Sequence, residues 1–140
     1  MSSVDHMTSV SLLQPAGLVH SPAFSHVAVL PPDVTQILIG GQNAVDEQGA
    51  LVGEGDFVAQ VHQVMANLTV ALSAADATMT DLVSIYLAVV EGTDLRAGYA
   101  AAAAHLGGIQ PPPLVSAVIV AGLAVPGALI ELSARAATVR

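Results

Sequence analysis

The residue of this sequence with the clearest capacity for chemistry is Glu131. It ends a long stretch without Asp, Glu, Lys or Arg that begins after Arg96. A carboxylate in such surroundings must be hydrated, be paired with a cation or have a functional role. Two interpretations follow: Glu131 pairs with an arginine of a neighbouring subunit, or it orients or activates a water molecule in a cleft.

The segment around Glu131, ALIELSARA, has the alternation of a β-strand. Side chains of a strand point in turn to its two faces. One face carries Leu129, Glu131, Ser133 and Arg135, and the other carries Ile130, Leu132, Ala134 and Ala136. We therefore expect the wholly apolar face to pack against helices and Glu131 to face away from them.

Other chemical signals are weak. The five histidines, His6, His20, His26, His62 and His105, show no metal-ligand spacing, so we expect no metal and no cofactor. We place His62 on a helix surface and His105 at a helix end, where its ring complements the dipole. The sequence lacks HExxH, P-loop, dinucleotide-binding and GxSxG motifs. It also has no cysteine, which excludes disulfides, thiolate metal sites and a cysteine nucleophile.

Two helices are predicted from apolar residues that recur every three or four positions. The first begins after Asp56, a good N-cap, and ends near 75–76. Its apolar face consists of Phe57, Val61, Val64, Leu68 and Leu72. The second is capped by Thr93 or Asp94 and stopped by the glycines at 107–108. Its predicted face consists of Leu95, Tyr99, Ala103 and Leu106.

Strands are predicted over residues 9–13, 24–30, 35–45, 82–90, 114–120 and 128–136, with a polar loop over 46–56. Gly40 and Gly41 interrupt the third strand and predict a bulge or a close approach by another backbone or a ligand. The order β-β-β-α-β-α-β-β indicates an α+β or α/β fold with a mixed sheet. Helices cover one face of that sheet, and the other face needs a partner.

Composition supports association. Residues 1–8 are expected to form a flexible extension before a single domain over 9–140. Only 10% of residues are charged, against about 25% in typical domains, while 54% are hydrophobic. We infer that several faces are buried against copies of the chain. A formal charge of −8, with three arginines and no lysine, argues against a nucleic-acid partner.

The apolar segment 110–130 raises the question of a membrane span. Prolines and glycines break it into pieces too short for a bilayer-spanning helix, so we interpret it as buried strands. The chain begins without a basic segment followed by a long apolar core, as a secretory signal would have. We therefore expect no membrane partner and a cytoplasmic location.

Several segments together resemble one family. They are ILIGGQNAVDEQGALV, the helical QVHQVMANLTVALSAADATMTDLVSIYLAVV, Tyr99 and the closing PPPLVSAVIVAGLAVPGALIELSARA. In this order, over about residues 14–137, they resemble the YjgF/YER057c/UK114 (RidA) family, whose members are also described as endoribonuclease L-PSP-like. The resemblance implies an α+β, chorismate-mutase-like fold. It also implies a homotrimer with a central barrel and three ligand clefts between subunits.

The resemblance further implies water-dependent deamination of enamines and imines, such as 2-aminoacrylate, to keto acids and ammonia. The family's site falls on Phe24, Gly40, Gly41, Tyr99, Val115 and Glu131. Gly41, Tyr99 and Glu131 keep the family's residue, whereas Phe24 replaces a tyrosine and Gly40 a serine. Val115 replaces the arginine that clamps the substrate carboxylate, and valine cannot form that bidentate pair.

Three functions remain open. The first is an atypical imine or enamine deaminase for an apolar or uncharged molecule, with Glu131 positioning water and Gly41 offering backbone contacts. The second is a non-catalytic trimer that binds a small metabolite. The third is a pathway deaminase resembling 2-aminomuconate deaminase, whose dicarboxylate substrate fits poorly with a cleft lacking arginine and a charge of −8.

Overall fold

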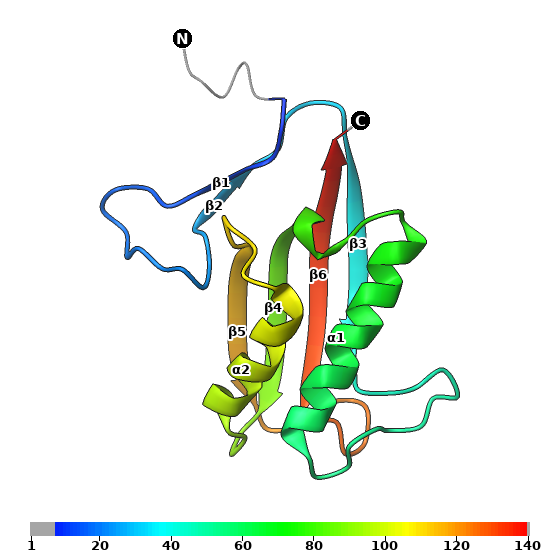
Figure 1. Ribbon diagram of the computed structural model, residues 1–140. Coiled ribbons are helices and arrows are strands. Elements are labelled where there is room, and N and C mark those ends of the chain that lie inside the picture. The colour runs from blue at the N-terminus through cyan, green and yellow to red at the C-terminus, as the bar shows by residue number, and fades with distance from the viewer. Residues whose placement is uncertain (1–7, 140) are drawn as a thin grey trace.

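A four-stranded mixed sheet forms the centre of the computed structural model, which describes residues 8–139 (Figure 1). The strand order is β3-β6-β4-β5, with bounds Val34–Gln42, Ile130–Val139, Leu82–Val90 and Leu114–Val120. β6 runs antiparallel to β3 and β4, whereas β4 and β5 are parallel. The parallel pair is joined through a helix, as a parallel connection requires.

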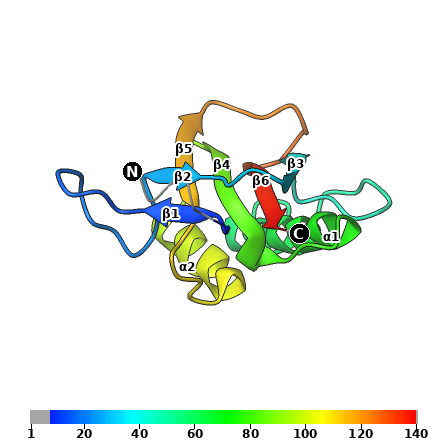
Figure 2. The same cartoon turned by 90° about the horizontal axis from the view of Figure 1, so that it is seen from above.

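Helices α1 (Phe57–Ala74) and α2 (Leu95–Leu106) cover the same face of the sheet (Figure 2). β1 (Ser11–Leu13) and β2 (Val27–Val29) pair separately as a two-stranded ribbon. A short 3₁₀ turn (Met79–Asp81) leads into β4. The predicted element order and the α+β class are therefore confirmed. The extension predicted over residues 1–8 lies outside the described residues, except for Thr8.

The first helix forms as its sequence predicts. Asp56 accepts a hydrogen bond from the backbone N–H of Ala59 at 3.0 Å and so caps the N-terminus. Of the predicted apolar face, Val61, Val64, Leu68 and Leu72 are buried. Phe57 is only partly buried, because it lies between α1 and α2 and not on the sheet. Met65 belongs to the same buried face and was not predicted.

The second helix departs from its prediction in one respect. Asp94 provides the N-cap, and Gly107 ends the helix with a φ of 62°. However, two residues of the predicted core face, Leu95 and Tyr99, are 49% and 60% exposed. The buried residues are Gly98 and Ala101, because α2 packs against α1 at the small residue Gly98. The predicted face is turned toward a cavity, described below.

Two strands keep their predicted bounds, β4 and β5, while the others differ at their ends. The predicted strands 24–30 and 9–13 shrink to three residues each, and β6 extends to Val139. Strand ends depend on where a pairing partner stops, and single-chain alternation carries no such information. The predicted bulge is confirmed, because the β3–β6 register shifts between Ile39 and Gln42, at the two glycines.

The two faces of the sheet differ as the alternation of β6 predicts. Ile130, Leu132, Ala134 and Ala136 are buried under the helices. The helix-free face carries Glu131, Ser133 and Arg135, together with their cross-strand partners Ala88, Tyr86 and Leu38. Leu38 is 72% and Tyr86 47% exposed, so large apolar side chains remain uncovered there in one chain. Within residues 8–139, no helix has the length and apolarity needed to cross a bilayer.

Candidate functional site

Glu131 lies half-buried on the helix-free face, beside the glycine bulge of β3. A Cβ atom placed on Gly41 would lie 2.9 Å from Cδ and 3.1 Å from Oε1 of Glu131. The carboxylate therefore occupies the space that any side chain at Gly41 would need. Within residues 8–139, this carboxylate has no hydrogen bond or ion pair with another side chain. It is thus available to a water molecule or a ligand.

Two buried amide side chains hold the backbone that leads into Glu131. Asn43 donates from Nδ2 to the carbonyl of Ile130 at 3.1 Å. Gln60 donates to the carbonyl of Gly127 at 3.0 Å and accepts from the N–H of Leu129 at 2.8 Å. Because both amides are buried, these bonds are shielded from water and position the strand firmly. Neither residue was predicted, although an amide within the apolar face of α1 is a signal visible in the sequence.

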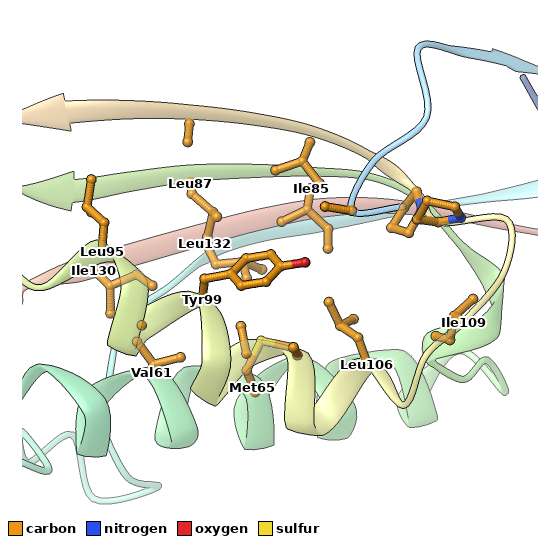
Figure 3. Close-up of a pocket in the computed structure, with 18 of the residues that line it drawn as sticks. Val61, Met65, Ile85, Leu87, Leu95, Tyr99, Leu106, Ile109, Ile130 and Leu132 are labelled. Atoms are coloured by element: carbon orange, nitrogen blue, oxygen red, sulfur yellow. The ribbon is translucent and has the colours of Figure 1, made fainter. Parts of the chain in front are cut away.

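Tyr99 and Val115 lie elsewhere, in a cavity of about 340 Å³ between α2 and the sheet (Figure 3). The strands contribute Ile85, Leu87, Val89, Val115, Ala117, Ile130 and Leu132 to its wall. The helices contribute Phe57, Val61, Met65, Leu95, Gly98, Tyr99, Ala102, Ala103 and Leu106. All four residues of the face predicted for α2 therefore line this cavity.

Val115 and Glu131 point to opposite faces of the sheet. Val115 pairs with Ile85 on β4, and both line the cavity on the helix side. Glu131 pairs with Ala88 on the helix-free face. One chain therefore does not bring these two predicted site residues into one cleft. A cleft that contains both requires a second subunit, as the inter-subunit site expected from the resemblance would provide.

Phe24 lies apart from both groups, in the segment that joins β1 to β2. Its ring meets His26 edge to face, with centroids 5.4 Å apart. The next residue, Ser25, donates from Oγ to the carbonyl of Pro112 at 2.6 Å and pairs with Leu114. Phe24 therefore lies near the start of β5 but does not line the cavity. The six predicted residues divide into Gly40, Gly41 and Glu131, then Tyr99 and Val115, then Phe24.

Two histidines with separate predicted roles, His62 and His105, form a pair. His62 is exposed on α1 and His105 lies in the last turn of α2, as predicted. Their Nδ1 and Nε2 atoms are 2.8 Å apart, which joins the two helices by a hydrogen bond. Among residues 8–139, no group of three or more His, Cys, Asp or Glu side chains could hold a metal ion.

Known proteins share this sequence pattern and fold. Residues 18–138 match the family model Endoribonuclease L-PSP. The structure of YyfB from Yersinia pestis, of the conserved Rid protein family, is 30% identical, covers 93% of this chain and 99% of its own, and has a TM-score of 0.80.

Two further structures share the fold at lower identity. Rv2704 from Mycobacterium tuberculosis, of the YjgF/YER057c/UK114 family, is 24% identical over 93% of this chain and 100% of its own, with a TM-score of 0.61. E. coli TdcF with bound serine is 21% identical over 74% of this chain and 80% of its own, with a TM-score of 0.66. A comparison with curated protein sequences gave no significant match. With most of its length matched by the family model, this chain belongs to the Endoribonuclease L-PSP family, that of the Rid and YjgF/YER057c/UK114 proteins.

Proposed function

We propose that this protein is an atypical imine or enamine deaminase, a hydrolase whose substrate is not anchored by the arginine usual in its family. The observation that carries this proposal is the carboxylate of Glu131, held against Gly41 with no side-chain partner among the described residues. A carboxylate held in place without an ion-pair partner is suited to act as a general base on water.

The reaction adds one water molecule across a C=N bond. Glu131 accepts a proton from water as the water oxygen bonds to the imine carbon, and the imine nitrogen takes up a proton from solvent. The resulting carbinolamine returns its hydroxyl proton to solvent as its C–N bond breaks, and the nitrogen leaves as ammonia with the proton held by Glu131. An enamine enters the same route after its carbon is protonated to give the imine. The products are one carbonyl compound and one ammonia for each water consumed.

The glycine bulge supports a binding role beside Glu131. A bulge leaves backbone groups outside the regular ladder. No atom of the described residues lies within 4 Å of the position of a Cβ on Gly40, so the backbone there is open to an approaching ligand. In the family site implied by the sequence, Gly40, Gly41 and Phe24 contact the substrate, together with Tyr99 and Val115. We propose that these contacts form between subunits of a homotrimer.

Val115 decides the substrate class in this proposal. A bound carboxylate needs a charged or hydrogen-bonding partner to offset the loss of its hydration. The side chain of Val115 supplies neither, and Arg96 and Arg135 are both exposed and away from the cavity wall. We therefore expect little turnover of 2-aminoacrylate and better turnover of imines without a carboxylate.

The alternative function is a non-catalytic trimer that binds a small metabolite. The apolar cavity favours it, because no Asp, Glu, Lys, Arg or His side chain is among the described residues that line it. The serine bound in the TdcF structure is consistent with a small-molecule ligand in either case. A deaminase resembling 2-aminomuconate deaminase has less support, since a dicarboxylate would lack an arginine partner in this cavity. We propose no nucleic-acid or membrane partner, no cofactor, and a cytoplasmic location.

Ammonia release from freshly generated imines tests the proposal. An amine oxidase would supply imines without a carboxylate, and an amino-acid oxidase would supply imines with one. Release above the spontaneous rate should be larger for the first class. Glu131→Gln should lower the accelerated rate roughly 10²–10⁴-fold, the usual contribution of a general base. Glu47→Gln, which removes the same charge from an exposed loop, is the matched control. A full rate in the Glu131 variant would remove Glu131 from the reaction, and no release above the spontaneous rate by the unmodified chain would favour the binding-only alternative.

A further inference from the structure

We propose that the cavity between α2 and the sheet binds an uncharged, largely apolar molecule whose hydrogen-bond acceptor is held by the hydroxyl of Tyr99. This inference deepens the proposed function, on which it rests, by naming the class of ligand. It stands on the size of the cavity, the chemistry of its wall and the placement of one polar atom.

The size of the cavity limits the ligand. A cavity of about 150 Å³ lined by apolar side chains holds a benzene molecule. At about 340 Å³, this cavity is more than twice that volume and has room for about a dozen non-hydrogen atoms. It also falls within the usual range for small-molecule sites, about 300–1,000 Å³.

The space exists because α2 presents small side chains to the sheet. Gly98, Ala102 and Ala103 line the cavity, and Leu95 and Leu106 stand toward the two ends of the helix (Figure 3). At Gly98, the ring of Phe57 comes so close that no Cβ could be accommodated, so α2 is supported by α1. The helix is thereby held above the strands, and the alanines leave the gap between them unfilled.

The wall of the cavity selects against charge. No Asp, Glu, Lys, Arg or His side chain is among the described residues that line it. An ion that entered would lose hydration without gaining a charged partner, which strongly disfavours its binding. Gln110 lies at the rim, but its side-chain N–H already donates to the carbonyl of Pro22. An uncharged molecule is the class that this wall accepts.

Tyr99 provides one polar contact. Its ring lies in the space between α2 and the strands, and its hydroxyl points toward the end that Leu106 and Ile109 line (Figure 3). Within residues 8–139, this hydroxyl has no hydrogen-bond partner. Tyr99 is also 60% exposed, so the cavity mouth is open to solvent beside it. A ligand with a carbonyl or imine group can enter there and accept the hydroxyl proton in a hydrogen bond.

Three probes of similar size test the ligand class by isothermal titration calorimetry on the full chain. They are acetophenone, with one acceptor; ethylbenzene, with none; and benzoate, with a charge. We expect acetophenone to bind more tightly than ethylbenzene, and benzoate to bind at least about 10-fold more weakly than acetophenone. Tyr99→Phe should weaken the binding of acetophenone about 2–10-fold, which corresponds to the loss of one net hydrogen bond, and should leave the affinity for ethylbenzene unchanged.

Filling the cavity tests its location. Ala103→Leu adds bulk inside the cavity, whereas Ala104→Leu makes the same change one residue away, on an exposed position that does not line it. We expect Ala103→Leu to weaken the binding of acetophenone at least about 10-fold and Ala104→Leu to weaken it less than about 2-fold. Ala117→Leu fills the cavity from β5 and should weaken binding in the same way, which covers a failure of the first variant to fold.

Four results would overturn the inference. The first is that neither uncharged probe binds up to its solubility limit, and the second is that benzoate binds as tightly as acetophenone. The third is that the two helix variants lose the same affinity for acetophenone. The fourth is that Tyr99→Phe loses the same affinity for both uncharged probes. Acetophenone has no nitrogen to release, so this assay is independent of hydrolysis. Probe binding without ammonia release would reject the deaminase alone, and ammonia release without probe binding would reject the ligand class alone.

Discussion

Glu131 and Gly41 share a space that holds only one side chain. The Cβ position of Gly41 lies 2.9 Å from Cδ of Glu131, closer than two non-bonded carbon atoms approach in proteins. The glycine bulge in β3 and the carboxylate in β6 therefore form one unit, although the two residues are distant in sequence. The bulge determines where the carboxylate can lie.

A methyl group at position 41 should therefore displace the carboxylate. We expect Gly41→Ala to lower imine hydrolysis by about 10²-fold, because small misplacements of a catalytic group have effects of that size. Gly122→Ala is the control, since a Cβ there meets no atom of residues 8–139 within 4 Å and Gly122 has no unusual φ. Both variants should fold, as checked by circular dichroism. Equal rates for both would show that the position of Glu131 does not limit the reaction.

An arginine at position 115 should restore affinity for carboxylates. We expect Val115→Arg to bind small keto acids, such as pyruvate, in calorimetry where the parent chain does not. The guanidinium enters an apolar wall, so the variant should lose up to several kcal/mol of stability without ligand. Val70→Arg adds the same charge at an exposed position of α1 that does not line the cavity and serves as the control. A folded Val115 variant that binds no keto acid would refute the assignment of Val115 to the family's cleft.

The buried face of α1 makes a direct prediction for stability. Leu68 is 0% exposed, so Leu68→Ala should reduce the free energy of unfolding by about 2–5 kcal/mol. Val70 lies on the same helix but is 71% exposed, and Val70→Ala should change the free energy of unfolding by less than about 0.5 kcal/mol. Urea denaturation measures both values. Similar losses at the two positions would mean that the helix is not packed as described.

The contact between His62 and His105 should behave as a coupled pair. Replacing either residue by alanine removes the 2.8 Å hydrogen bond between the helices and should cost about 0.5–1.5 kcal/mol of unfolding free energy. The double replacement should cost clearly less than the sum of the single ones, because the shared bond is lost only once. A double-mutant cycle from denaturation curves at one pH measures this coupling. Strictly additive losses would indicate that the two rings do not interact in solution.

The uncovered apolar side chains of the helix-free face predict self-association. Leu38, Tyr86 and Val118 are all exposed there in one chain. We expect light scattering at micromolar concentration to give the mass of three 14.1 kDa chains. Leu38→Asp should shift the protein toward smaller species, because it places a charge in the expected interface. A monomeric mass for the unmodified chain would contradict the trimer and with it the inter-subunit cleft.

The sequence by itself was sufficient for the features that depend on neighbouring residues. The repeat of apolar residues in α1, its Asp56 cap and the alternation around Glu131 are local patterns, and each formed as predicted except at Phe57, which lies between the two helices. The paired glycines predicted a bulge or a close approach, and the register of β3 and β6 shifts at Gly40 and Gly41. Glu131 was recognisable because a lone carboxylate in an apolar stretch is visible without any structure.

Only the tertiary structure decided which of these features meet. The strand register places Val115 and Glu131 on opposite faces, and a change of one residue in register would have reversed this. The contact of His62 with His105 and the support of Glu131 by Gln60 join segments far apart in the chain. The cavity arises because α2 rests on α1 and not on the sheet. Each of these depends on non-local pairing and packing, which local periodicity does not encode.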